Sequence, residues 1–191
     1  VGRATTDYLG EARRLVAFLG LTTVTLGRSL AQPRRIRRTA LISHMEQTGL
    51  DAVPIVALIS FLVGAVLAYQ GAQQLRNFGA EIFVIDLIGI SVLREIAILL
   101  TAIIVAGRSG SAFTAAIGSM KVREEIDAMR TLGLDPMELL VMPRLLALMI
   151  TLPMLAFLAD MAGLAGGMVM AWAALDISPA QFIERLGDAI P

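Results

Sequence analysis

The sequence lacks cysteine and has one histidine in 191 residues. Disulfides, thiolate metal sites and cysteine nucleophiles are therefore excluded. His44 alone does not make a histidine-rich metal site, and we expect it to be a solvated or interfacial side chain. The formal net charge is zero, and we expect no nucleic-acid partner. We also expect no metal, no cofactor and no catalytic residue in this chain.

Hydrophobic residues are in excess, at 57% of the chain, with a mean hydropathy of +0.75. Soluble domains have about 45–50% apolar residues. The excess lies in three blocks, 53–69, 82–106 and 145–175, each suited to a membrane-spanning helix of about 20 residues. The third block is longer than one straight span, so we expect a tilt or a kink at Pro153. Gly163 and Gly167 form a GxxxG motif there, which favours close helix packing.

The first 50 residues have a different pattern. Leu15, Phe18 and Leu19 follow Arg13 and Arg14 in a stretch whose apolar run is too short to span a bilayer. We expect an amphipathic helix in the membrane surface, followed by a basic elbow at 34–38, RRIRR. A soluble helical hairpin is the alternative. We divide the chain into this N-terminal part, 1–51, and a transmembrane domain, 52–191.

The distribution of lysine and arginine predicts the orientation. Thirteen of these residues lie before residue 52 or between 107 and 144, whereas only Arg76 and Arg185 lie in the other two segments outside the spans. Basic loops stay on the cytoplasmic side, so we expect the N-terminus and the 107–144 segment to be cytoplasmic. Tyr69 and Trp172 then fall at the outer interface, which amphipathic aromatic residues favour.

The segment 107–130, GRSGSAFTAAIGSMKVREEIDAMR, interrupts the apolar pattern. Its first half indicates a small-residue loop, and it lacks the GxxxxGK[ST] pattern of a phosphate-binding loop. Its second half predicts a short amphipathic helix over 121–130, ended by Gly133 and Pro136. We expect i,i+4 ion pairs between Lys121 and Glu125 and between Arg123 and Asp127. A solvated surface helix is the simpler interpretation, but a helix between two spans can also transmit force from a partner.

Three charges lie inside the apolar blocks: Arg94, Glu95 and Asp160. Each costs roughly 2.5–3.5 kcal/mol near the bilayer centre, so something must offset that cost. Adjacent helical residues point about 100° apart, so Arg94 and Glu95 cannot simply neutralise each other. They either pair with neighbouring helices and order the bundle, or they line a functional cavity.

The order of these segments resembles the MlaE (YrbE) permease family, which forms the membrane subunits of lipid-transporting ABC transporters. The resemblance rests on VPIVALISFLVGAVLAYQ, on LREIAILLTAIIVAGRSGSAFTAAIGSMKVREEIDAMRTLGLDP and on PRLLALMITLPML, and its most specific part is 107–136. Family members commonly have Gly-Pro after the Arg-Glu, where this sequence has Ala97 and Ile98. The family also has further spans after the third, so we expect the sequence, which begins at Val1 and stops at Pro191, to be truncated.

The resemblance implies an all-α inner-membrane protein that works as a homodimer. It implies two ABC ATPase subunits that bind MgATP, a periplasmic MCE-domain protein, often a STAS-domain protein, and phospholipid as cargo. The helix after the second span would be the coupling helix that docks on the ATPase, which assigns coupling candidates: Lys121, Arg123, Glu124, Glu125, Asp127 and Arg130. Gly107 and Gly110, with Gly163 and Gly167, are candidates for close packing.

The resemblance also implies a lipid path within the membrane. Arg94 could meet a lipid phosphate, and Glu95 could meet an amine or hold Arg94 in place. Asp160 is a third candidate for this path. Gln70, with Gln73 and Gln74, could line its outer exit. The rival function is an ion-coupled carrier that uses Arg94, Glu95 and Asp160 as a relay, and a scaffold without transport activity is a third.

Overall fold

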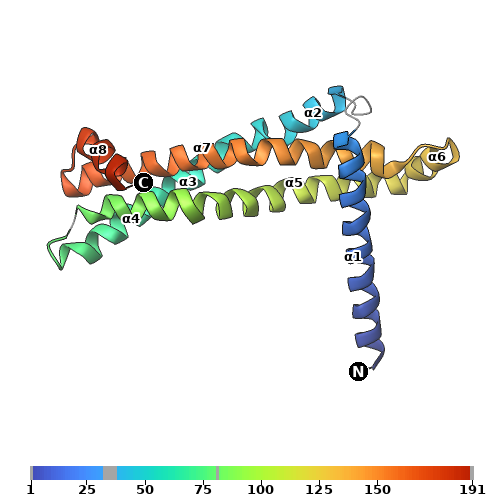
Figure 1. Cartoon of the computed structure of the whole chain (residues 1–191), viewed down its shortest axis with the longest axis horizontal. Helices are drawn as coiled ribbons and strands as arrows, with labels where there is room; N and C mark the ends of the chain where they lie inside the picture. The colour runs from blue at the N-terminus through green and yellow to red at the C-terminus, as the bar shows by residue number, and fades with distance from the viewer. Residues whose placement is uncertain (1, 32–37, 81, 190–191) are drawn as a thin grey trace. The chain divides into compact units, whose positions relative to one another are not determined.

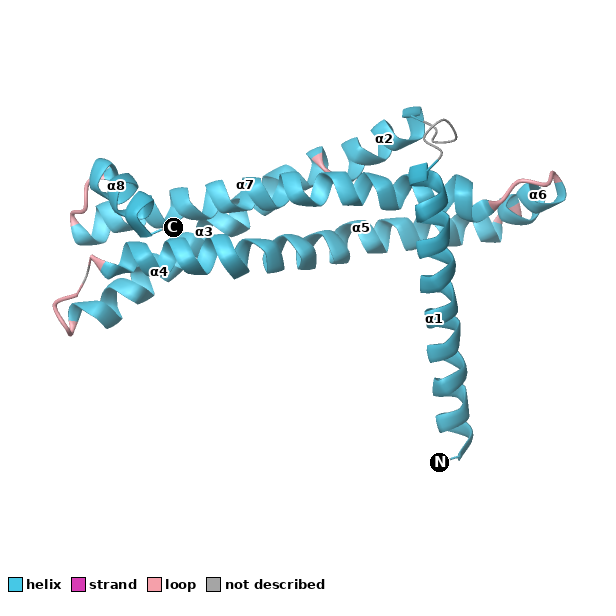
Figure 2. Ribbon diagram, in the orientation of Figure 1, coloured by secondary structure: helices cyan, strands magenta, loops and turns pink. Residues whose placement is uncertain are grey.

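The computed structural model describes residues 2–31, 38–80 and 82–189 (Figure 1). Helices and short connections make up all of these residues, and no strand occurs among them (Figure 2). The α-helices are α1 Gly2–Ala31, α2 Arg38–Thr48, α3 Val53–Arg76, α4 Phe83–Ser91, α5 Ala97–Val122, α6 Glu125–Thr131, α7 Met142–Leu175 and α8 Pro179–Ala189. A short 3-10 helix, η2 Leu50–Ala52, and two π-helical turns, η3 Val92–Ile96 and η4 Met137–Val141, join them.

Among the described residues, three continuous helical stretches are long and apolar enough to cross a membrane: Thr39–Arg76, Phe83–Val122 and Met137–Leu175. This confirms the predicted all-α membrane protein with three spans. Each helix is longer than its apolar block because the polar residues that flank the block continue the same helix. The third runs through Pro153 without a break, although proline removes one backbone hydrogen bond.

The described chain forms two compact units. The first contains 1–45 and 114–148, and the second contains 46–113 and 149–191. In the first unit, α1 has exposed apolar side chains such as Leu15 and Phe18 and is not among the spanning candidates of the described chain. Residues 34–37 of the expected basic elbow lie outside the described residues, and Arg38 begins α2.

Glycines bring α3 and α7 into backbone contact in the second unit. A Cβ on Gly64 would overlap the carbonyl oxygen of Gly163, and a Cβ on Gly166 would overlap that of Phe61. The carbonyl oxygen of Ser60 lies near Gly163 and that of Gly64 lies near Gly167, so the two helices run in the same direction. Small residues let backbones approach closely in this way within a membrane.

The second span packs on the same glycines in the opposite direction. Val92 lies 2.8 Å from the position of a Cβ on Gly163, and Ile88 lies 2.9 Å from that on Gly167. Both α3 and α8 also contact α4, and Figure 1 shows α8 beside α4. The fully buried Phe182 anchors α8, and Leu186 lies 2.7 Å from the position of a Cβ on Gly89.

The length of the first span between Asp51 and Tyr69 fits the thickness of a bilayer. Arg108 on α5 pairs with Asp51 at 3.5 Å and donates to the carbonyl of Gln47 at 3.4 Å. From Asp51 to Tyr69 a helix rises about 27 Å, close to the ~30 Å hydrocarbon core. The contacts of Gly64 with Gly163 and Gly167 put Tyr69 level with Trp172, and both rings are exposed. The two aromatic residues therefore occupy one level of the bundle, as an interfacial belt requires.

Candidate functional site

Arg94 and Glu95 lie on the π turn η3, midway along the apolar block 82–106 of the second span. The amide of Ala97 donates to the carbonyl of Val92, five residues earlier, which marks a wider turn than an α-helix has. Both charged side chains are exposed, and neither has a hydrogen bond or ion pair with any other described residue. Single π turns inside α-helices frequently mark functional sites. Two charges in a spanning segment thus face away from the bundle of this chain.

Asp160 lies on α7 about one turn before Gly163. Its Oδ1 is buried and has no hydrogen-bond partner among the described residues. Val92 contacts Gly163 and Ile88 contacts Gly167, and continuing this antiparallel register by one turn puts Glu95 level with Asp160. The structure records no ion pair between Asp160 and Arg94, and this holds for the described part of the chain. The three charges share a level of the bundle without pairing.

Gln70 lines an open hollow at the end of α3. Its volume is about 520 Å³, and Leu67, Gly71, Gln73, Gln74, Leu75, Asn77 and Leu87 complete its wall. The side chains of Gln70, Gln73 and Gln74 are exposed. The hollow combines uncharged amide groups with leucine side chains, so it offers hydrogen bonds beside an apolar surface.

A second open hollow, of about 410 Å³, lies between α8 and the start of α4. Its lining includes Asp176, Glu184 and Asp188, with Arg185. Arg185 donates to both carboxylate oxygens of Asp86, at 3.1 and 2.9 Å, and its guanidinium lies 5.3 Å from the ring centroid of Phe83. A capping box begins α8: the amide of Gln181 donates to Ser178 Oγ, and the amide of Ser178 donates to Gln181 Oε1.

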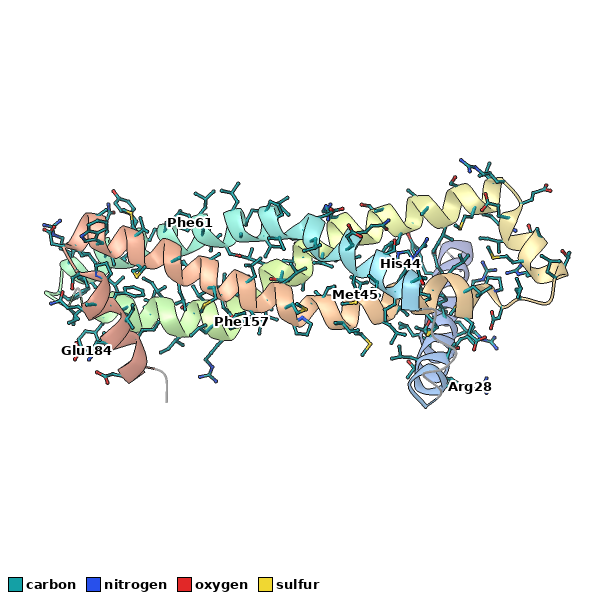
Figure 3. The ribbon with its side chains drawn as sticks, turned by 90° about the horizontal axis from the view of Figure 1, so that it is seen from above. Arg28, His44, Met45, Phe61, Phe157 and Glu184 are labelled. Carbon is teal, nitrogen blue, oxygen red and sulfur yellow. The ribbon has the colours of Figure 1, made fainter. Side chains whose placement is uncertain are left out.

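We expect Asp86→Asn to loosen α8 from α4. The pair is part-buried and bidentate, so losing one charge should cost about 1–3 kcal/mol. Limited proteolysis at 176–189, in detergent, should become faster. Glu184→Gln is the matched control, since Glu184 is exposed on the same helix (Figure 3). Equal cleavage of both variants would show that the pair does not hold α8.

The charged stretch at 121–130 divides into the end of α5 and a separate helix. The predicted small-residue loop at 107–120 is wrong, because α5 continues through it to Val122. The predicted single helix over 121–130 is also wrong: Glu124 has φ +60°, which turns the chain, and α6 begins at Glu125. Gly133, with φ +75°, follows the end of α6, near where the sequence predicts the stop.

This turn also changes the ion pairs. Lys121 bonds Asp127 at 2.6 Å rather than Glu125, and Arg130 lies 3.5 Å from Asp127. Arg123 lies 3.8 Å from Glu125 rather than near Asp127. The i,i+4 pairing prediction fails because Glu124 breaks the helical register between the partners. Of the six coupling candidates, only Glu124 has no ion pair among those the structure records in its described part.

The hydrogen bond from Lys121 lowers the pKa of Asp127 below its ordinary value of 3.8, and the charges of Lys121 and Arg130 add to this. Because the pKa is lowered in the folded state, the ionised carboxylate stabilises the folded turn at pH values above 3.8. The contribution is lost as the pH falls from there through the pKa of the folded state.

We therefore expect faster amide exchange over 121–131, relative to intrinsic rates, at about pH 3 than at about pH 6. Asp127→Asn should abolish that difference in pH response. An unchanged response in the variant would show that another group causes it.

Apolar side chains stand on either side of the charged turn. Val122 is 85% exposed and Leu132 is 76% exposed, although both are large hydrophobic residues. Exposed apolar residues among charges that are already paired with each other are typical of a protein-binding surface. We call Val122, Leu132 and α6 the α6 surface.

The four candidate packing glycines fall into two environments. Gly163 and Gly167 lie in the contact between α7 and the two other spans. A Cβ added to Gly107 or Gly110 would meet no described atom within 4 Å other than near chain neighbours, so the bundle leaves room there.

The sequence did not predict three contacts of the structure: that of Gly64 with α7, that of Arg108 with Asp51, and that of Asp86 with Arg185. A lone glycine in an apolar run and charges far apart in sequence give no local signal of such contacts.

Comparison with known proteins decides the family. The sequence profile of the permease MlaE family matches residues 41–191, which include nearly all of the first span, the whole of the other two and the α6 surface. The chain belongs to the MlaE permease family. The match begins within α2 and leaves α1 outside it.

Curated relatives of this family member come from distant organisms. A probable ABC transporter permease protein of Synechocystis is 37% identical over 80% of this chain and 58% of the relative. The intermembrane phospholipid transport system permease protein MlaE of Haemophilus influenzae is 35% identical over 71% of this chain and 53% of that protein. The chloroplastic protein TRIGALACTOSYLDIACYLGLYCEROL 1 of Arabidopsis thaliana is 32% identical over 72% of this chain and 39% of its length. The chain spans about half the length of the bacterial relatives it matches.

Proposed function

We propose that this chain is part of the permease subunit of an ABC transporter that moves phospholipid between two membranes. Family membership over residues 41–191 carries the proposal. The name of the Haemophilus relative specifies phospholipid transport between membranes, and that of the Synechocystis relative specifies an ABC permease. We assign the chain to the inner membrane by analogy with the MlaE family. We assign its N-terminus to the cytoplasm from the excess of lysine and arginine before residue 52 and in 107–144.

The α6 surface is the proposed docking site for the ATPase. It is a short helix joined to the second span through a sharp turn, so a push on α6 acts on that span directly. Its charges are mostly paired with each other, which leaves Val122 and Leu132 as apolar anchors for a partner. The partner binds MgATP and hydrolyses it, and this chain supplies no catalytic group. A periplasmic MCE-domain protein and a STAS-domain protein complete the proposed complex.

The lipid path follows the exposed side of the spans. Arg94 suits a phosphate and Glu95 suits an amine, while leucine and isoleucine side chains around them suit acyl chains. Toward the α8 end, the hollow at Gln70 offers uncharged hydrogen-bonding groups beside leucines, as an exit for an amphiphilic molecule requires. Asp160 lies level with Glu95 and completes the polar part of the path.

The proposal is tested by purifying the tagged full-length protein from native membranes in mild detergent. Mass spectrometry should recover an ABC ATPase, an MCE-domain protein and bound phospholipid. If the protein emerges without an ATPase yet transports its substrate in response to an ion gradient, the ion-coupled carrier replaces this proposal.

Glu95→Gln should reduce both phospholipid transport and the amount of co-purified phospholipid. The substitution keeps the shape of the side chain and removes the charge that faces the path. Thin-layer chromatography of extracted lipid, together with a transport assay in reconstituted vesicles, measures the two quantities. Unchanged values in both would show that Glu95 is structural.

A further inference from the structure

A stripe of buried residues runs along each of the three spans in the second unit. On α3 the stripe recurs at every fourth position, at 56, 60, 64, 68 and 72, and α7 has the same spacing at 151, 155, 159, 163, 167 and 171. On the second span the stripe is 84, 88 and 92, followed by 97, 101, 105 and 109. Its step of five residues falls on the π turn η3. In an α-helix a step of five turns a residue about 140° away, so the π turn keeps both halves of the stripe on one face.

The stripes of the second and third spans face each other. Val92 lies 2.8 Å from the position of a Cβ on Gly163, and Ile88 lies 2.9 Å from that on Gly167. Four residues forward on one helix therefore correspond to four residues back on the other. Continued past the π turn, this order puts Thr101, which is 1% exposed, level with Leu155, which is 3% exposed.

The sequence of α5 contains a second stripe, one position earlier. The residues directly before 97, 101 and 105 are large, aliphatic and half-buried: Ile96, Leu100 and Ile104. The stripe that now faces inward is less apolar, since it includes Thr101. The Oγ1 atom of Thr101 is buried and has no hydrogen-bond partner among the described residues, which is unfavourable in an apolar interior. Two neighbouring stripes of α5 are thus suited to the interior.

Closing the π turn into an α-helix would exchange the two stripes. With α4 in place, each residue of α5 would take the position of the residue after it, a rotation of about 100° and a shift of about 1.5 Å toward α6. Isoleucine and leucine need more room than alanine and threonine, so α5 would stand farther from α7. Because Arg94 and Glu95 lie on η3, the same change would reorient both charges.

Arg108 holds α5 in its present register. It pairs with Asp51 at 3.5 Å and donates to the carbonyl of Gln47 at 3.4 Å. After the exchange Gly107 would occupy the position of Arg108, and glycine has neither a charge nor a side-chain donor. Both contacts would break, so they favour the state in which the π turn is present.

We propose that η3 is a register switch, which turns α5 between a state with Thr101 toward α7 and a state with Leu100 toward α7. The inference rests on the permease proposed above and specifies how a movement at α6 reaches Arg94 and Glu95. The helix α5 is continuous from η3 to Val122, so it transmits an axial step from one end to the other. Packed helices have discrete alternative arrangements, and shifts of 1–2 Å between them are a common form of switching.

The absence of cysteine allows each register to be detected by its own cross-link. In the full-length complex, the T101C/L155C pair should form a disulfide at rest on oxidation with copper phenanthroline. The L100C/L155C pair should form it only after trapping with MgATP and vanadate. L99C/L155C is the matched control and should form none in either state, because residue 99 faces away in both registers. Cleavage at Met120 and Met154 separates the two cysteines, so mass spectrometry shows whether the fragments are joined.

Weakening the contact of Arg108 tests the switch without nucleotide. Arg108→Gln removes the charge that pairs with Asp51, and Asp51→Asn removes it from the other side. Each substitution should raise the L100C/L155C yield several-fold at rest and lower the T101C/L155C yield. An unchanged ratio of the two yields in both variants would show that this contact does not select the register.

Deletion of Leu93 removes the extra residue of the π turn and fixes α5 in its present register. The protein should keep its membrane content and its Tm in detergent, and T101C/L155C should cross-link in every nucleotide state. Phospholipid transport should be lost. Deletion of Ile103 is the matched control: it lies within regular helix, where no wide turn absorbs the loss, so the protein should be destabilised. Equal destabilisation by the two deletions, or normal transport without Leu93, overturns the switch.

The outcomes distinguish this inference from the proposed function. If an ATPase is bound and trapped but the cross-links do not exchange, the switch is overturned and the permease stands. If both pairs cross-link equally at rest, α5 has no fixed register and the switch is likewise overturned. If no ATPase is recovered, the permease proposal fails, and the cross-links in Arg108→Gln alone decide whether α5 has two registers.

Discussion

Replacing Gly64 or Gly166 with alanine is expected to destabilise the protein more than any other single methyl group added to it. At both positions the new Cβ would overlap a backbone carbonyl oxygen of the facing helix, Gly163 for Gly64 and Phe61 for Gly166. A backbone atom cannot move aside as a flexible side chain can, so α3 and α7 must separate along their length. Overpacking costs about 1–3 kcal/mol in ordinary cores, and we expect the upper end of that range here.

Thermal unfolding in detergent measures this effect. A loss of about 3 kcal/mol corresponds to a decrease of roughly 6–12 °C in Tm for a protein of this size. Gly118→Ala is the matched control, because Gly118 also lies inside a helix and its added methyl group has no such contact within the described residues. Equal Tm values for the Gly166→Ala and Gly118→Ala proteins would show that the helices are not in backbone contact.

The sequence predicts the number and place of the spans because their signal is composition. About 20 apolar residues in a row have few alternatives to a spanning helix. The same reasoning fails at 107–120, where glycine, serine and alanine indicate a loop in water. In the structure these residues continue α5, since small side chains are also compatible with a helix that starts in an apolar span.

The local backbone of the candidate site could not be predicted. The sequence has Ala97 and Ile98 directly after the turn, and neither residue signals a kink, yet the π turn at 92–96 widens the helix next to Arg94. The left-handed turn falls on Glu124, a residue without special preference for φ +60°. Neither feature has a signal in the local sequence. The sequence therefore indicates which charged residues belong to the candidate site, but not how they pair.

Placing a charge on the α6 surface is expected to detach the proposed ATPase. Leu132→Asp or Val122→Asp puts a carboxylate where an exposed apolar side chain now stands, and a partner that buries it must remove its water. Loss of a central apolar anchor costs about 2 kcal/mol or more, which is a roughly 30-fold weaker affinity. Co-purification of the ATPase and phospholipid transport should therefore fail together, while the amount of permease in the membrane stays the same.

Conservative variants show whether shape or polarity matters. Leu132→Met and Val122→Ile keep an apolar surface and should retain the ATPase. If Leu132→Asp retains it as well, the α6 surface is a solvated helix and the docking site lies elsewhere.

Two substitutions of Glu124 distinguish the effect of its backbone conformation from the effect of its charge. Glu124→Gly removes the carboxylate and also relieves the φ +60° conformation, which costs a non-glycine residue about 1 kcal/mol or more. The turn should therefore become more stable, whereas Glu124→Gln removes only the charge.

Neutral replacement of Glu124, Glu125 and Asp127 together should abolish transport if their charges contact the ATPase. If Glu124→Gln keeps the ATPase bound and Glu124→Gly uncouples hydrolysis from transport, the strained turn itself transmits the force to the second span.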